Sequence, residues 1–553
     1  MNNPVIQREL LGMLSHPKAL AIQAVPAAVF GILVIIRWPT DSRVDLSGSQ
    51  LLQVFGLFGY GMLATMILLV PAFPATSIVR EKTSGTLALL LNSPMSAWSI
   101  YSGKLLGVLV FVLLPLVLSF PAAAACYAVG GLSLSGDLLG LYLILTVLAL
   151  QCTAVGLLVS SLAGSSDAAL RITYGIVLLI TVMSLGPHQF LQGTTWGWIS
   201  DAALWLRYLS PIPPVMEIVG HSDIGGHGLA VKTVGPWRYA AIALATTVIG
   251  MLVTVSRLRP LMFDRSRPAG VITDDRSGLQ RVVRRFFFII DPQRRSGQIG
   301  RFTNPVLVKE FRCRRFGRSQ WLFRLVAVSA VASLGLTYAS TTGTMDWGVD
   351  AIGGMLVVLE VAMIGLITPS LGSSLISSET ETGGWALLRA TPLSTGQILR
   401  GKLMSALWPL ILILFATLPG YAIMIFIEPG LTQQISYVLF SLFLTALFAL
   451  MLSVAVSSLF RRTDLATVTS YSLLLACLGG TLLVWLGRDT TFSYRTVETL
   501  LLFNPVAAAL SIMGTPGFSQ YHLVPTNWWL IGVASIACMC VLYFQTWRLT
   551  RPR

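Results

Sequence analysis

One acidic residue, Glu360, lies inside a long apolar run, between Val357 and Val361. A carboxylate is costly to bury at the depth of a lipid bilayer, so such a residue indicates a functional group or a side chain held by structural hydrogen bonds. The corresponding run of the first half has no acidic residue, and no other apolar run carries a clear partner. A proton relay and a structural role both stay open for Glu360.

Other residue types that could perform chemistry are sparse. His221, Asp223 and His227 could ligate a metal, but they flank the flexible Gly225-Gly226 pair and lack a fourth ligand, which favours a solvated loop. No G-x-x-x-x-G-K-[ST] phosphate loop occurs, because Gly103-Lys104 and Gly401-Lys402 lack the upstream glycine and the downstream hydroxyl. We therefore expect no catalytic residue, no metal and no bound cofactor in this chain.

The composition excludes an ordinary soluble protein. Of 553 residues, 54% are hydrophobic and 11% are charged, whereas soluble domains contain about 25% charged residues. The net charge of +15 comes mostly from residues 257–324, which hold 17 basic and 5 acidic residues, or +12. Arginines beside aromatic residues in this stretch, such as Arg285-Phe286, could indicate nucleic acid. Anionic membrane lipid is the better interpretation, and we expect no nucleic-acid partner.

Apolar runs of the length that spans a bilayer define the elements that hold these residues. We predict an all-α polytopic membrane protein of about twelve transmembrane helices. If both termini lie inside, the inner segments carry 31 Lys and Arg and the outer segments 7, so the positive-inside rule predicts cytoplasmic termini in the cell (cytoplasmic or inner) membrane. The predicted spans are 19–36, 51–75, 105–130, 138–161, 172–186, 236–256, 322–340, 351–376, 403–427, 435–459, 465–487 and 527–547.

The two halves of the chain repeat each other, which indicates a parallel 6+6 arrangement. We predict a first six-span repeat at 1–257, a basic cytoplasmic linker at 258–302 and a second repeat at 303–553. The matched residues include Asn3-Pro4-Val5 with Asn304-Pro305-Val306, Arg8-Glu9 with Lys309-Glu310, Glu81 with Glu379, Leu89 with Leu387, Gly103-Lys104 with Gly401-Lys402, Ser160 with Ser457, Tyr174 with Tyr471 and Arg257-Leu258 with Arg548-Leu549.

Each half opens on a segment that predicts an amphipathic helix on the inner leaflet. Pro4 and Pro305 suit a first helical turn, and Val306, Leu307 and Phe311 can face one way while Lys309, Arg312 and Arg315 reach lipid phosphates. A plain solvated helix is the alternative. Late in each half, the outer segments 187–235 and 488–526 contain proline-broken apolar pieces, 208–215 and 503–510, that we expect to dip into the outer leaflet.

A cytoplasmic loop between the second and third spans occurs in both halves, at 80–94 and 378–392. Thr83 or Ser84 can cap a short helix whose apolar face holds Leu87, Leu90 and Leu91. Ser394-x-x-Gln397 forms a capping box for the next span. Such a helix could dock a soluble partner or only brace its own spans.

These motifs resemble those of the type-2 ATP-binding-cassette permeases, here as two half-permeases fused in one chain. The resemblance rests on Asn-Pro-Val…(Arg/Lys)-Glu in each half, on Arg80-Glu81-x-x-x-Gly85-Thr86-Leu87…Leu90…Pro94, and on Asn504-Pro505. The second loop departs from the pattern at Ser378 and at Gly384-Trp385, so its half could dock differently.

The resemblance implies the permease subunit of an exporter without its own nucleotide-binding site. An ATP-binding-cassette ATPase subunit, in two copies, would carry ATP and Mg and would engage a coupling helix in each half; membrane lipids and an unknown substrate complete the partners. A proton-coupled secondary transporter and a membrane anchor of a larger assembly are the alternatives. The implied docking residues are Arg80, Glu81, Gly85, Thr86, Leu87, Leu90, Pro94, Glu379, Glu381, Gly383, Leu387 and Pro392.

Overall fold

The structure is a computed structural model that describes most of the chain. It covers residues 3–14, 49–128, 132–164, 166–185, 197–219, 236–258, 304–313, 349–486, 493–515 and 517–550, and seven isolated positions (24, 31, 327, 330, 331, 333 and 334). The described residues form helices and no strands. They belong to two compact units, one of 1–264 with 479–500 and one of 265–478 with 501–553.

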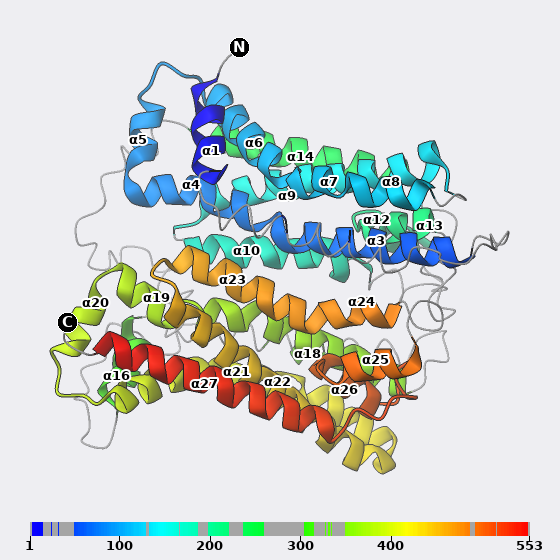
Figure 1. Ribbon diagram of the computed structural model, residues 1–553, viewed down its shortest axis with the longest axis vertical. Helices are drawn as coiled ribbons and strands as arrows, with labels where there is room; N and C mark the ends of the chain where they lie inside the picture. Colours follow the sequence, from blue (N-terminus) through cyan, green and yellow to red (C-terminus); the bar gives the residue numbers. More distant parts are fainter. Residues whose placement is uncertain are drawn as a thin grey trace, which may run out of the picture. The chain divides into compact units, whose positions relative to one another are not determined.

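The first unit holds the helices of residues 1–264 and the helical residues of 479–500, which were assigned to the second repeat in the sequence (Figure 1). Its core lies among α3, α9, α13 and the start of α14, where Phe55, Leu141 and Tyr239 are fully buried. Its elements are α1 (Pro4–Leu14), α3 (Ser49–Leu69), α4 (Ala72–Ser84), α5 (Thr86–Leu91), α6 (Ala97–Val112), α7 (Leu114–Leu118), α8 (Phe120–Ala128), η1 (Leu134–Leu138), α9 (Leu139–Leu162), α10 (Ser166–Leu178), η2 (Leu179–Met183), α12 (Gly197–Arg207), α13 (Ile212–Val219) and α14 (Pro236–Arg257), joined by α24 (Thr481–Leu486) and most of α25 (Tyr494–Leu501).

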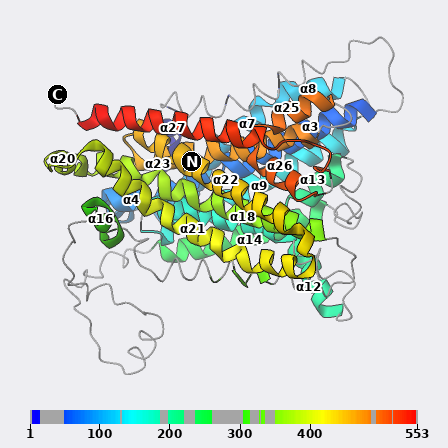
Figure 2. The ribbon, with the colours of Figure 1, turned by 90° about the horizontal axis from the view of Figure 1, so that it is seen from below.

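The second unit has a similar order of elements, without a counterpart of α12 among its described residues, and Figure 2 shows its long helices α18, α21, α22 and α27 running beside one another. The predicted capping box is present: Ser394 Oγ accepts from Gln397 N, and Gln397 Oε1 accepts from Ser394 N. The elements are α16 (Pro305–Cys313), α18 (Val349–Gly372), α19 (Ser374–Glu381), α20 (Gly384–Arg389), α21 (Thr395–Ile427), η6 (Pro429–Leu431), α22 (Thr432–Leu459), α23 (Thr463–Leu475), η7 (Ala476–Gly480), α26 (Pro505–Ile512) and α27 (Thr526–Thr550).

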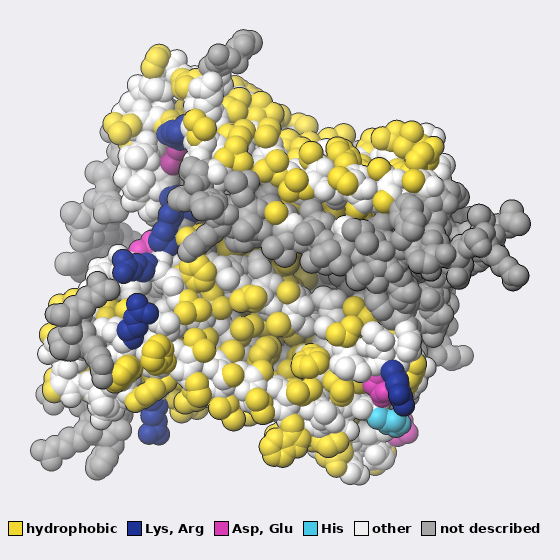
Figure 3. Space-filling view, in the orientation of Figure 1, with side chains coloured by type: hydrophobic (Ala, Val, Ile, Leu, Met, Phe, Trp, Pro, Cys, Tyr) yellow, Lys and Arg dark blue, Asp and Glu magenta, His cyan; other side chains and the backbone are white. Residues whose placement is uncertain are grey.

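Eight helical segments of the described chain are long and apolar enough to cross a membrane. They correspond to eight of the twelve predicted spans, and shorter apolar helices at 168–181 and 465–480 correspond to two more. The remaining two, 19–36 and 322–340, lie outside the described residues except for isolated positions, as do His221, Asp223, His227 and nearly all of the linker 258–302. Apolar side chains cover the sides of the helices in Figure 3, as lipid contact requires.

The repeat extends to individual hydrogen bonds. Ser160 Oγ accepts from the backbone N of Ile78 and Val79 at 3.0 and 2.9 Å, and Ser457 Oγ accepts from Ile376 and Ser377 at 3.0 Å each. The paired tyrosines each donate 2.6 Å hydrogen bonds to a backbone carbonyl of their own half, Tyr174 to Leu68 and Tyr471 to Leu366. The matched residues therefore occupy matched places in the two units.

A close helix approach is conserved between the halves, but the glycine that permits it is not. In the first unit, a Cβ at Gly156 of α9 would lie 2.6 Å from Pro74 Cγ of α4. In the second unit, a Cβ at Gly372 of α18 would lie 2.6 Å from Ser453 Cβ of α22. Ser453 corresponds to Gly156 and Gly372 to Pro74 at the repeat offsets, so the small residue has changed helix.

The proline-broken outer segments form short helices packed against their own unit. α13 packs on α3 and α9, and α26 packs on α18 and α22. Asn504 caps α26 by accepting from Val506 N and Ala507 N, and its Nδ2 donates to Leu478 O at 2.9 Å. Protein therefore buries these segments, as their polar backbone requires at the edge of a membrane.

Candidate functional site

The opening helix of each half packs tightly on the helix that follows the short helix α5 or α20. A Cβ at Gly103 of α6 would lie 2.8 Å from Val5 Cβ of α1, so only glycine permits this approach. Asn3 fixes the contact because its Oδ1 accepts from Val5 N and its Nδ2 donates to Ser99 O at 2.7 Å. The repeated Asn-Pro-Val and Gly-Lys motifs are thus the two sides of one helix contact.

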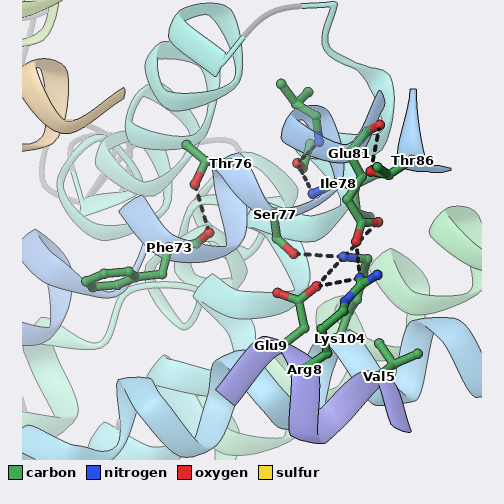
Figure 4. A network of polar contacts seen from close by, with 12 residues as sticks. Val5, Arg8, Glu9, Phe73, Thr76, Ser77, Ile78, Glu81, Thr86 and Lys104 are labelled. Carbon is green, nitrogen blue, oxygen red and sulfur yellow. Dashed lines mark hydrogen bonds and ion pairs between the residues drawn. The ribbon is translucent and has the colours of Figure 1, made fainter. Parts of the chain in front are cut away.

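Beside this contact a buried lysine holds two glutamates together (Figure 4). Lys104 is 1% exposed, and its Nζ lies 2.7 Å from Glu9 Oε1 and 3.0 Å from Glu81 Oε2. Ser77 Oγ accepts from the same ammonium at 3.3 Å. Arg8 contacts both carboxylates from the exposed side. The network joins three elements, α1, α4 and α6, at one point.

The second unit repeats this network with its own residues. Lys402, 2% exposed, lies with its Nζ 2.6 Å from Glu310 Oε1 and 3.2 Å from Glu379 Oε1. Lys309 takes the place of Arg8 and contacts Glu379 Oε1 at 2.6 Å. A Cβ at Gly401 would lie 2.8 Å from Val306 Cβ, so the helix contact is repeated too. We predicted that Lys309 reaches lipid phosphate; the structure pairs it with Glu379.

The charges explain how two glutamates are tolerated where they stand. Glu81 and Glu379 lie in the last turns of α4 and α19, and an acidic residue is unfavourable at the negative end of a helix dipole. Lys104 and Lys402 offset this cost, and each buried ammonium in turn requires the carboxylates, since an unpaired buried charge costs several kcal/mol. Each network is therefore stable only when both the lysine and its glutamates are present.

The short helix α5 is present where the sequence predicts it, but its start differs. The helix α4 continues through Thr83 and Ser84, whose hydroxyls donate to Arg80 O and Glu81 O instead of capping α5. The cap residue is Gly85, in the left-handed region at φ +77°, without a side-chain cap. The predicted hydroxyl cap was therefore wrong, because the preceding span is longer than the apolar run suggested.

The predicted apolar face of α5 points into the protein. Leu87 and Leu90 are buried with Leu91 against Ile78, Tyr101 and Leu258. The leucine left exposed is Leu89, at 74%. The predicted docking residues Arg80, Thr86 and Pro94 are exposed as well, and Glu81 is held in the Lys104 network.

The second short helix, α20, has the same form. Gly383 stands at φ +75°, Trp385 and Leu388 are buried, and Leu387 is 75% exposed. Pro392 is exposed. Glu381 does not join the ion network: its Oε2 accepts from Thr463 N at 2.9 Å and Thr463 Oγ1 at 2.6 Å, so it fixes the start of α23.

Both short helices contact the end of the last span of their own half. Leu258, directly after α14, is buried with Leu87 and Leu90. In the second unit Trp385 Nε1 donates to Leu549 O of α27 at 3.3 Å. The leucine of the repeated Arg-Leu pair that ends each half is therefore part of the surface on which the short helix packs, which we call its seat.

Glu360 lies apart from these networks, fully buried in α18. Its Oε2 lies 3.0 Å from Thr417 Oγ1 and 3.5 Å from Tyr421 OH, both on α21. The structure therefore brings it together with hydroxyl groups.

The residues that connect the elements do not stand out as such in the sequence. Glu9, Lys104, Glu310 and Lys402 are recognisable there only as parts of the repeat, and Leu89 only as a matched position. The signal was available: charges of the same sign recur at the same places in both halves, and a glutamate at a helix C-terminus calls for a nearby cation.

Comparison with known protein families gives a match over both halves. The family model described as ABC-2 family transporter protein matches residues 18–266 and 305–551. No curated protein matches the chain. The two matched stretches contain both short helices, both buried lysines and Glu360.

Proposed function

The chain belongs to the ABC-2 family of transporter proteins, and from this premise we propose that it is the permease of an ATP-driven exporter, energised by a separate ATP-binding subunit. That subunit, in two copies, would carry ATP and Mg and dock on α5 and α20. The termini and both short helices would then face the cytoplasm, in agreement with the distribution of Lys and Arg.

The observation that carries this proposal is a helix with one exposed leucine and a rigid seat, present in both halves. Leu89 and Leu387 are 74% and 75% exposed, while the other leucines of the two helices are buried, as is Trp385. An exposed apolar side chain on a fixed helix is suited to a pocket on a partner protein. The left-handed glycines at 85 and 383 set the direction of each helix independently of the span before it.

The seat supplies a route for force. Pressure on α5 would reach α4 through Gly85, α6 through Ile100 and Tyr101, and the end of the last span through Leu258. The Lys104 network would pass the same displacement to α1. Closure of an ATPase dimer on two such seats would change the arrangement of the spans.

The test is docking of the ATP-binding subunit. We expect Leu89→Ser and Leu387→Ser to weaken copurification of that subunit and to reduce its stimulated ATP hydrolysis, each by about tenfold or more, as for a buried anchor residue at an interface. Matched controls are Asn92→Ser and Ala390→Ser, which are exposed directly after the same helices and correspond to each other in the repeat.

Two results would contradict the proposal. One is unchanged copurification and ATP hydrolysis in the Leu89→Ser, Leu387→Ser double variant. The other is an equal loss in the two control variants, which would indicate general damage to the loops. Thermal unfolding of each variant without the partner separates docking from folding, since exposed side chains contribute little to stability.

A further inference from the structure

We propose that Glu360 carries a proton in this conformation and forms, with Thr417 and Tyr421, an intramembrane proton-binding site of the second half. The site lies between α18 and α21, where Glu360 and Thr417 are completely buried and Tyr421 is 1% exposed. The ligand is a single proton on Glu360 Oε2.

The partners of Glu360 are too few for a charged carboxylate. Among the described residues, Thr417 Oγ1, at 3.0 Å, and Tyr421 OH, at 3.5 Å, are the groups that hydrogen-bond with Oε2. In the same part of the chain Oε1 has no hydrogen-bond partner, and Glu360 takes part in no ion pair. An unpaired carboxylate in an apolar interior costs many kcal/mol, so such a group gives up its charge.

The hydrogen count on Thr417 leads to the same conclusion. Thr417 Oγ1 is 3.0 Å from Leu414 O as well as 3.0 Å from Glu360 Oε2, and a hydroxyl has one hydrogen. If Glu360 is ionised, the Thr417 hydroxyl can donate its hydrogen either to Glu360 Oε2 or to Leu414 O, but not to both. If Glu360 is protonated, its O–H donates to Thr417 Oγ1, which donates to Leu414 O. Only the protonated form makes both short contacts hydrogen bonds.

In the part of the chain that the structure describes, no cation faces the site from the helices packed against α18. Lys402 is paired at the far end of α21, fifteen residues from Thr417, or about 22 Å along a helix. Tyr471 on α23 donates to Leu366 O, and Glu379 and Glu381 on α19 are bound to Lys402 and Thr463. The remaining titratable residues on these helices are Arg400 on α21, Tyr437 and Cys477 on α22 and η7, and Asp464 on the first turn of α23; α26 has none.

The first half lacks this site. At the repeat offset that relates Glu81 to Glu379, Glu360 corresponds to Met62, Thr417 to Ser119 and Tyr421 to Ala123. Met62 is buried. Ser119 Oγ donates to Leu116 O and also lies within hydrogen-bond distance of Tyr142 OH, at 2.7 Å. A neutral side chain therefore suffices to pack this place in a half-permease, so packing alone does not require a carboxyl group.

The site is also linked to the ion network of Lys402, Glu310 and Glu379. α18 continues into α19, which carries Glu379, and α21 carries both Lys402 and Thr417. A displacement of α21 against α18 and α19 changes the contact of Lys402 with Glu379 and the contact of Thr417 with Glu360 together. Loss of the Thr417 acceptor and entry of water would then favour release of the proton.

The test is infrared difference spectroscopy of the full-length protein in lipid nanodiscs at pH 7. We expect the wild type to show the carbonyl band of a protonated carboxyl group, shifted by deuterium exchange, which Glu360→Gln removes with an amplitude of one group per chain. The matched control is Glu428→Gln, an exposed glutamate directly after α21, which should leave that band unchanged.

Loss of a carboxylate band instead of the protonated band in Glu360→Gln would overturn the proposal. If that variant does not fold, Glu360→Met, which introduces the residue of the first half, provides the same comparison. Thr417→Val should keep the band but shift it to higher frequency, because the acceptor is gone. An unshifted band in Thr417→Val would overturn the hydrogen-bond assignment.

Discussion

At the scale of single residues, the unusual feature is an ammonium group buried at the meeting point of three helices. Lys104 and Lys402 each bridge a glutamate on the opening helix and one at the end of the second span. The glutamates are 3–14% exposed, so little solvent screens these contacts. Arg8 and Lys309, at 51% and 41% exposure, lie at the rim.

Removal of the central charge should therefore cost more than removal of the rim charge. Removing one side of a buried ion pair typically costs about 3–5 kcal/mol. We expect Lys104→Met to lower the free energy of unfolding by a large part of this amount. Arg8→Gln should change stability by about 1 kcal/mol or less. Unfolding followed by tryptophan fluorescence measures both, and equal effects would contradict this division of the network.

At the scale of elements, the decisive contact is that of the opening helix with the helix behind the short one. It depends on Gly103 and Gly401, because a methyl group at either place would meet the valine of the opening helix. This geometry places Glu9 and Glu310 within reach of the buried lysines. The opening helix is therefore fixed to the bundle.

Gly103→Ala should loosen α1 specifically. The added methyl group overfills the contact, at a cost of about 1–3 kcal/mol, and hydrogen exchange of residues 4–14 should become faster. Gly12→Ala is the matched control, since nothing lies within 4 Å of its Cβ and alanine favours a helix. Faster exchange in the control, or none in Gly103→Ala, would argue against the close contact.

At the scale of the whole molecule, the chain contains two copies of the same arrangement, a short helix beside a buried ion network, in separate compact units. The copies differ in detail: Leu87 is replaced by Trp385, and Glu360 has no acidic counterpart. The two ion networks share no residue among the described contacts. Each network is therefore complete within its own unit.

This separation predicts additivity. Without a partner, the stability losses of Lys104→Met and Lys402→Met should add to within about 0.5 kcal/mol in the double variant. With the ATP-binding subunit present, their effects on ATP hydrolysis should not add, because one damaged seat already impairs a dimer. A coupling above about 1 kcal/mol in the isolated chain would show that the networks communicate directly.

The sequence predicted the helices and the repeat well because both depend on local patterns. The capping box at Ser394 and the proline-broken outer helices follow from residues within a few positions of each other. The ion networks join Glu9 to Lys104 across 95 residues, and no local pattern encodes that distance. The burial of Leu87 depends likewise on Leu258, which is remote in the chain.

The glycine that changed helix has a consequence for recombination between the halves. Transfer of the serine of α22 to α9, as Gly156→Ser, would drive a hydroxymethyl group into the ring of Pro74, whereas Ser453→Gly would leave two facing glycines and a gap. Hybrids made one helix at a time are thus overfilled in one half and underfilled in the other. Only the exchange of both contacting helices as a pair preserves this contact, so chimeras of the two halves should be cut at pairs of helices.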